Sequence, residues 1–184
     1  MKRALATRGS SYLRKPTGHD GREFVDAVLR HREHLEPYVY AAESMSAYRS
    51  WLALGDRVDV EQFLVCRRED DAIVGFVNLN NMTGGALQSA ALGWASFAGD
   101  RPKGHLTEGV EMAMEVAFTQ LRLHRLEANI QPANERSRQL AIRCGFRQEG
   151  FSPRYLQIDG EWRDHERWAL LQEDWRGRRH GRHE

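Results

Sequence analysis

The segment 101–108 constrains the fold most, because it places a basic, glycine-containing turn directly before an amphipathic helix. Apolar residues recur beyond it at three- and four-residue spacing, which predicts a helix over 106–121. The first turn of a helix has backbone N–H groups without intrahelical partners and carries partial positive charge. Gly104 lets the backbone approach a ligand closely, and Arg101 and Lys103 add charge. The segment therefore predicts an anion-binding helix start, with an ordinary solvated basic loop as the alternative.

Changes of hydrophobic period along the rest of the chain indicate alternating helices and short strands. Asn134 is placed as the N-cap of a second short helix, about thirty residues after the basic turn. The charged turn 69–71 and the turn 159–160 each separate two β-rich runs, which indicates two hairpins. The expected strands are 11–15, 62–67, 72–79, 86–97, 124–130, 151–158 and 162–171, and the expected helices are 21–34, 46–54, 106–121 and 134–144.

Length and composition indicate one domain, since 41% of the 184 residues are hydrophobic and suffice for a substantial core. Lys plus Arg (27) nearly balance Asp plus Glu (26), so the chain has no overall polyanion-binding signature. We expect residues 1–174 to form the domain and 175–184, with four arginines and two glycines, to form a basic flexible tail. Such a tail is solvated by default; the sharper alternative is weak contact with ribosomal RNA or an acidic partner.

The two cysteines, Cys66 and Cys144, form neither a metal-ligand spacing nor a disulfide scaffold. Each fits the role of a small buried apolar residue, so we expect no metal site. No apolar run approaches membrane-spanning length, and the first ten residues lack the apolar core of a secretory signal. These observations predict a cytoplasmic protein without membrane contact.

Four segments together carry a resemblance to one enzyme family. They are His34-Leu35-Glu36-Pro37-Tyr38; Arg101 to Glu108; Leu123 to Ala128 with Pro132, Asn134, Ser137 and Gly145-Phe146; and Glu149-Gly150 leading to Tyr155 through His165. With them the chain is similar to the GCN5-related N-acetyltransferases (GNAT), and within these to the RimJ/RimL branch, whose named members acetylate the N-termini of ribosomal proteins. The last segment looks closer to RimJ-type alanine acetyltransferases than to RimL-type ones.

This resemblance implies an α+β GNAT fold, with a mixed, mostly antiparallel central sheet of about six or seven strands flanked by about four helices and with splayed central strands. It also implies acetyl-CoA as cosubstrate. The coenzyme-binding residues that it implies are Leu92, Trp94, Ala95 and Phe97 on the splayed strand, Arg101, Lys103, Gly104, His105, Leu106 and Thr107 in the pyrophosphate turn, and Asn134 and Ser137 on the next helix.

The candidate catalytic residues are Ser137 and Tyr155. Ser137 matches the residue proposed in RimL-like enzymes to protonate the leaving thiolate. Tyr155, together with Asp164 and His165, is a candidate for a proton relay. A helix-surface hydroxyl for Ser137 and purely structural roles for the other three are the alternatives.

The absence of the usual general bases indicates which class of amine the enzyme acetylates. Where related enzymes carry a glutamate, this chain has Ala91 and Leu156. At pH 7 an α-amine with a pKa near 8 needs only about 1 to 1.5 kcal/mol to lose its proton, whereas a lysine near 10.4 needs about 4 to 5 kcal/mol. A water relay or a weak base is enough to deprotonate the α-amine, so an N-terminal α-amine is the favoured acceptor. We expect it to attack acetyl-CoA directly within a ternary complex.

Three functions remain open at this stage. The leading one is an acetyl-CoA-dependent N-acetyltransferase of a protein N-terminal α-amine, of the ribosomal-protein-alanine type, acting as a monomer or homodimer. The second keeps the chemistry but changes the acceptor to a small amine such as an antibiotic or polyamine. The third is a non-catalytic acyl-CoA-binding or ribosome-associated module.

Overall fold

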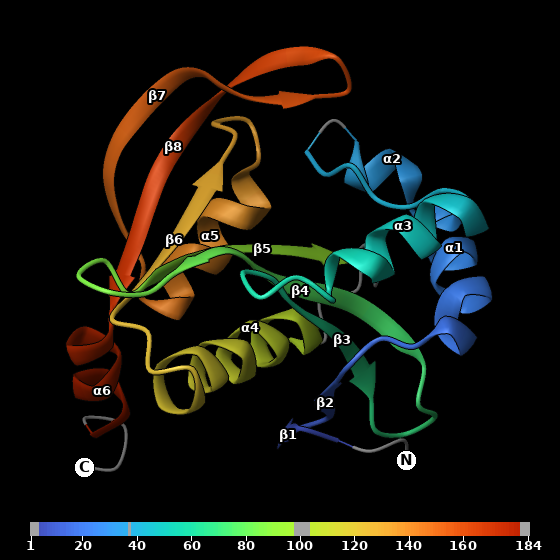
Figure 1. Cartoon of the computed structure of the whole chain (residues 1–184), viewed down its shortest axis with the longest axis horizontal. Coiled ribbons are helices and arrows are strands. Elements are labelled where there is room, and N and C mark those ends of the chain that lie inside the picture. The colour runs from blue at the N-terminus through green and yellow to red at the C-terminus, as the bar shows by residue number, and fades with distance from the viewer. Residues whose placement is uncertain (1–3, 37, 98–103, 181–184) are drawn as a thin grey trace.

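The computed structural model describes residues 4–36, 38–97 and 104–180, and one mixed sheet runs through them. Its eight strands follow the order β1-β2-β3-β4-β5-β6-β8-β7 (Figure 1). Neighbouring strands are antiparallel except β5 and β6, which are parallel. The expected α+β fold is therefore confirmed, with eight strands in place of six or seven. The strands are β1 (Ala6–Arg8), β2 (Ser11–Arg14), β3 (Glu61–Arg67), β4 (Ile73–Thr83), β5 (Ser89–Ser96), β6 (Arg125–Ile130), β7 (Arg147–Ile158) and β8 (Glu161–Leu171).

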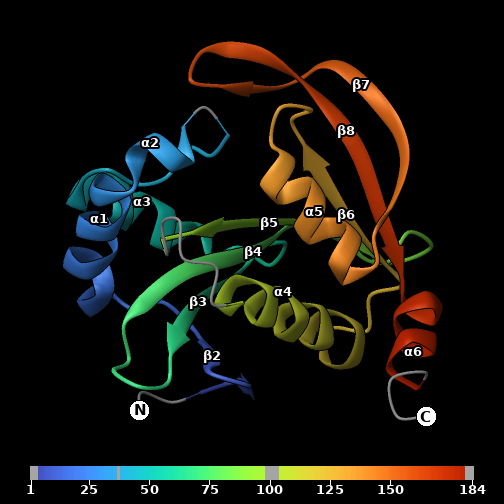
Figure 2. The ribbon, with the colours of Figure 1, turned by 180° about the vertical axis from the view of Figure 1, so that it is seen from behind.

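Helices cover both faces of this sheet, as the two opposite views in Figures 1 and 2 show. Helices α1 and α3 pack on one face, while α4 and α5 pack on the other. The helical elements are η1 (Gly18–Asp20), α1 (Gly21–Arg30), α2 (Arg32–Leu35), α3 (Met45–Leu54), α4 (His105–Glu115), the π-helical continuation η2 (Val116–Gln120), α5 (Glu135–Cys144) and α6 (Gln172–His180).

Strand β3 shows how one sheet serves two hydrophobic cores. Phe63 and Val65 belong to the core under α4 and α5, whereas Leu64 and Cys66 belong to the core under α1 and α3. Successive side chains of a strand point to opposite faces, so a strand covered on both faces has an unbroken apolar run. The central strands are thereby held rigidly, and α4 is seated on the sheet.

The C-terminal segment is helical over most of the expected basic tail. Residues 172–180 form α6, and Trp175, placed at the start of the tail by the sequence, is buried against Phe118 with ring centroids 5.2 Å apart. Arg178 donates a hydrogen bond to the carbonyl of Arg143 at 3.1 Å. Burial of a large aromatic ring and this link to α5 order the segment, which the glycine- and arginine-rich composition did not indicate. Residues 181–184 of the expected tail lie outside the described residues.

A buried ion pair fixes the chain where it leaves β2 for the helices. The guanidinium of Arg14 donates to both carboxylate oxygens of Asp20, at 2.7 and 2.8 Å, and both side chains are almost fully buried. Asp20 also accepts hydrogen bonds from the backbone N–H and the hydroxyl of Thr17 at 2.8 Å. This pair holds the start of α1 against the sheet edge.

Candidate active site

The two parallel strands at the centre of the sheet separate part-way along their length. Pairing between β5 and β6 covers only three positions, the last of which joins Ala91 to Glu127. Beyond this point β5 stays hydrogen-bonded to β4 through Ser96, and β6 stays bonded to β8 through Ile130. Each strand therefore keeps its outer partner while the inner edges open, and two cavities lie along this opening.

The larger cavity has a volume of about 690 Å³ and lies between the first turns of α4 and α5. This volume is within the range of small-molecule and cofactor pockets. Most of the residues expected to bind the coenzyme line it: Trp94, Ala95, Gly104, His105, Leu106, Thr107, Asn134 and Ser137. The basic turn and the start of the second helix, both singled out in the sequence, therefore form two walls of this cavity, and the fold brings them together.

Four of the expected coenzyme residues are placed differently or are not described; Leu92, which lines the smaller cavity, is taken up below. Phe97 lines neither cavity; its ring is buried in the α1/α3 core, 5.2 Å edge-on from Phe24. Its side chain therefore packs in this core. Arg101 and Lys103 lie outside the described residues.

The start of α4 has the backbone geometry of an anion site. Gly104 is the N-cap with φ of +77°, a left-handed conformation, and a Cβ built on it would meet nothing within 4 Å. The first N–H groups of α4 begin here and have no partner within the helix. The imidazole of His105, in contrast, is buried and its Nδ1 lies 2.8 Å from the hydroxyl of Ser11. The side chain of His105 is therefore held against β2.

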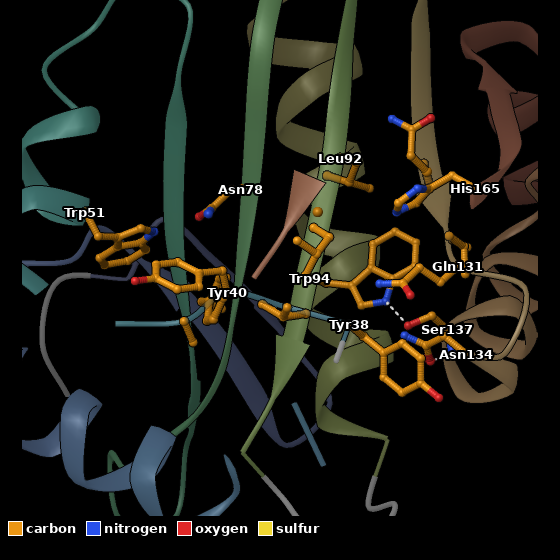
Figure 3. Close-up of a pocket in the computed structure, with 18 of the residues that line it drawn as sticks. Tyr38, Tyr40, Trp51, Asn78, Leu92, Trp94, Gln131, Asn134, Ser137 and His165 are labelled. Atoms are coloured by element: carbon orange, nitrogen blue, oxygen red, sulfur yellow. Dashed lines mark hydrogen bonds between the residues drawn. The ribbon is translucent and has the colours of Figure 1, made fainter. Parts of the chain in front are cut away.

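The start of α5 is joined to β5 by a short chain of hydrogen bonds. Oδ1 of Asn134 accepts from the backbone N–H of Ser137 at 3.1 Å, which is the N-cap geometry expected from the sequence. The Ser137 hydroxyl accepts from Nε1 of Trp94 at 3.3 Å, as the dashed line in Figure 3 shows. Since an indole N–H only donates, the oxygen is the acceptor and the hydroxyl proton stays available to another group. This contact across the opening has no sequence signal.

The smaller cavity, about 270 Å³, adjoins the larger one, and both are lined by Tyr38, Trp94, Asn134 and Ser137. Its remaining wall is aromatic, aliphatic and amide in character and includes Trp51, Asn78, Leu92 and Gln131 (Figure 3). Among its described lining residues there is no Asp, Glu, Lys or Arg. The side-chain oxygens of Asn78 and Asn129 are buried there without a hydrogen-bond partner among the described residues. Leu92 thus lies at this cavity, not at the larger one where it was expected.

His165 reaches the smaller cavity from β8, and its side chain is only 3% exposed. Its Nδ1 lies 3.0 Å from the carbonyl oxygen of Arg163, and burial lowers the pKa of the imidazole below its ordinary value. Tyr155 lines neither cavity; its ring stands edge-on to His165 at 6.1 Å. The Asp164 carboxylate accepts from the backbone N–H of Arg154 at 2.7 Å. Of the three relay candidates, only His165 faces a cavity.

Within 4–36, 38–97 and 104–180, no three His, Cys, Asp or Glu side chains gather closely enough to hold a metal ion. No helix in the same ranges is long and apolar enough to cross a membrane.

Residues 11–147 match the family model described as an acetyltransferase (GNAT) domain. The chain belongs to the GNAT family. The match contains the parting strands, the start of α4 and the start of α5, which together form the larger cavity.

Individual relatives agree with the RimJ-like resemblance. The chain is 36% identical over 112 residues to the probable N-acetyltransferase YjcK of Bacillus subtilis, covering 61% of this chain and 62% of that one. It is 36% identical over 107 residues to the ribosomal protein uS5-alanine N-acetyltransferase of Escherichia coli, covering 58% and 55%. The match thus spans less than two thirds of the length of either relative.

A solved structure extends the likeness over more of the fold. The structure of Mycobacterium smegmatis RimJ in complex with CoA-disulfide superposes with a TM-score of 0.81 at 31% identity. The superposition covers 89% of this chain and 83% of that one. The GNAT fold is therefore shared with a protein solved with a coenzyme A derivative.

Proposed function

We propose that this protein is an acetyl-CoA-dependent N-acetyltransferase that transfers acetyl to a protein N-terminal α-amine, of the ribosomal-protein-alanine type. The observation that carries the proposal is the pair of cavities that share Trp94 and Ser137. One cavity has the helix starts that bind a phosphate-bearing coenzyme, and the other is a smaller chamber for an amine. A shared wall puts the thioester and the amine next to each other.

The larger cavity is assigned to acetyl-CoA. The N–H groups at the start of α4 would hold the pyrophosphate, with Arg101 and Lys103 as the proposed charged neighbours. The β5 backbone from Trp94 would pair with the pantetheine arm, and Asn134 would donate its amide hydrogens to it. The CoA-disulfide complex of the RimJ structure supports this choice of ligand.

The proposed reaction is a direct transfer in a ternary complex. The amine nitrogen attacks the thioester carbon, the C–S bond breaks, and the new amide loses one proton while the departing thiolate gains one. Ser137 is proposed to protonate the departing thiolate, because its hydroxyl accepts a hydrogen bond from Trp94 and keeps its own proton for donation. Neither cysteine is suited to a covalent route, since both are buried and burial raises the pKa of Cys66.

The chemistry of the smaller cavity supports a singly charged or neutral acceptor over a polycation. A polyamine carries several ammonium groups, which need carboxylates or water when they leave solvent. The described lining has no carboxylate and instead presents Trp51, Tyr38 and the unpaired amide oxygen of Asn78. An N-terminal α-amine on a small residue such as alanine fits this surface, because its amine hydrogens can meet amide oxygens and its methyl group can meet rings. Contact of the basic C-terminal residues with ribosomal RNA stays a prediction.

A competition assay tests the acceptor class. The protein is incubated with acetyl-CoA and an equimolar mixture of three acceptors: an alanine-initiated peptide, a peptide with a blocked N-terminus and a free lysine, and spermidine. Mass spectrometry should show acetylation of the first well ahead of the second, because lysine deprotonation needs about 3 kcal/mol more at neutral pH. Preferred acetylation of spermidine would support the small-amine alternative. Coenzyme binding without transfer to any amine in a broad panel would favour the non-catalytic module.

A further inference from the structure

The unexplained feature of the smaller cavity is a buried histidine that the mechanism above does not use. His165 is the one ionisable side chain among the described lining residues other than tyrosine. Figure 3 shows its ring directed toward Trp94 and Gln131, on the same side of the cavity as Ser137. Burying an imidazole costs free energy unless its ring nitrogens form hydrogen bonds, so the partner of each nitrogen has to be identified.

The contact at Nδ1 settles which nitrogen carries the proton. Nδ1 lies 3.0 Å from the carbonyl oxygen of Arg163, and a carbonyl oxygen can only accept a hydrogen bond. Nδ1 is therefore the N–H donor, and the neutral ring has a lone pair on Nε2. No partner is seen for Nε2 among the described residues, and Nε2 is not one of the fully buried unpaired atoms.

The surroundings keep the ring in this neutral form. Tyr155 from β7 packs edge-on to the imidazole, and Tyr38 and Trp94 line the same cavity. On its own strand the Asp164 carboxylate turns to the backbone N–H of Arg154, while the Arg167 guanidinium lies 4.5 Å from the Tyr155 ring centroid and donates to Glu127 at 3.0 Å. No carboxylate of the described residues accepts a hydrogen bond from the ring. Burial lowers the pKa of the imidazole and outweighs the Arg163 carbonyl and the Asp164 charge, which raise it.

We propose that Nε2 of His165 is the general base that takes the proton from the acceptor amine, an inference that rests on the proposed function. The amine nitrogen forms the bond to the thioester carbon, one of its protons passes to Nε2, and the C–S bond breaks to release the thiolate. The thiolate takes its proton from Ser137, and the imidazolium returns its proton to solvent, from which the Ser137 hydroxyl is restored.

The Arg163 carbonyl and Tyr155 are positioning groups in this scheme. The carbonyl selects the tautomer, and the tyrosine ring restrains the imidazole plane. This arrangement gives Tyr155 a role through His165, although the tyrosine itself lies outside both cavities.

The decisive variant is His165→Gln, which keeps an amide of similar reach but cannot take a proton. General-base catalysis contributes about 10²- to 10⁴-fold, so kcat at pH 7 should fall by about 10²-fold. The ratio of wild-type to variant kcat should shrink to below about tenfold at pH 9, where an α-amine with a pKa near 8 is already mostly neutral. The affinity for acetyl-CoA should be unchanged. His124→Gln, at an exposed histidine paired with Glu173, is the matched control and should leave kcat unaltered.

A ratio that stays constant between pH 7 and pH 9 would show that His165 is only structural and would overturn the proposal. A readout independent of turnover is the two-bond ¹H–¹⁵N spectrum of the imidazoles in the wild-type protein, which should show the Nδ1–H tautomer at pH 7. Protonation of Nε2 at that pH overturns the proposal whatever the acceptor. If the wild type acetylates a small amine but no N-terminal peptide, the proposed function fails, while the same pH comparison on that amine still decides the role of His165.

Discussion

Gly109 offers the sharpest test of how the fold positions the coenzyme cavity, because it seats α4 on the sheet. A Cβ added at Gly109 would lie 2.4 Å from Cγ2 and 2.9 Å from Cγ1 of Val65, far inside ordinary contact distance. Val65 is fully buried on the central strand β3 and is branched at Cβ, so it cannot swing aside. Gly109→Ala must therefore lift α4 away from the sheet by roughly an ångström.

The expected free energies follow from three terms. Overpacking a core costs about 1 to 3 kcal/mol, while replacing glycine with alanine inside a helix gains up to about 1 kcal/mol. We expect Gly109→Ala to lower the free energy of unfolding by about 1 to 2 kcal/mol. Val65→Ala, which removes two buried methyl groups, should lower it by about 2 kcal/mol. In the double variant the new methyl occupies the vacated space, so the total loss should be only about 1 kcal/mol, a coupling of about 2 kcal/mol.

The assay is urea unfolding followed by tryptophan fluorescence, together with calorimetric affinity for acetyl-CoA. Because α4 begins at the proposed pyrophosphate site, Gly109→Ala should weaken binding and the double variant should restore it. Gly84→Ala is the control, since its methyl meets nothing within 4 Å. Additivity of the two single changes to within about 0.5 kcal/mol would refute the reasoning, because it would mean that the two side chains do not compete for one space.

Three further predictions concern the same framework. Ser137→Ala should lower kcat more than it weakens acetyl-CoA binding, whereas Asn134→Ala should weaken binding and lose about 1 kcal/mol of cap stability; the reverse pattern would exchange their roles. Gly104→Glu should weaken calorimetric acetyl-CoA affinity by well over tenfold, and Gly104→Ala, which bears only the backbone penalty of about 1 to 2 kcal/mol, separates strain from charge. Asp20→Asn should lower the free energy of unfolding by about 3 to 5 kcal/mol in urea titrations, because it leaves the buried Arg14 charge unpaired; a loss below about 1 kcal/mol would show that the site admits water.

Much of the fold is visible in the sequence because its signals are local. The helix that begins beside Gly104, the Asn134 cap and most of the strands follow from periodicity and turn chemistry within a few residues. The motifs that resemble RimJ-type enzymes are also short, contiguous runs. These signals sufficed for the GNAT fold, which the family match confirms, and they named eight of the residues that line the larger cavity.

The tertiary structure alone decided how distant side chains meet. The Trp94 contact with Ser137 joins residues 43 positions apart, and the Ser11 contact that turns His105 inward joins residues 94 positions apart. Neither contact is signalled in the sequence, because the hydrophobic period shows which face of an element is buried but not which side chain lies opposite it. The same holds for the neutral wall of the smaller cavity, which comes from separate elements on both sides of the opening and whose character depends on their packing together.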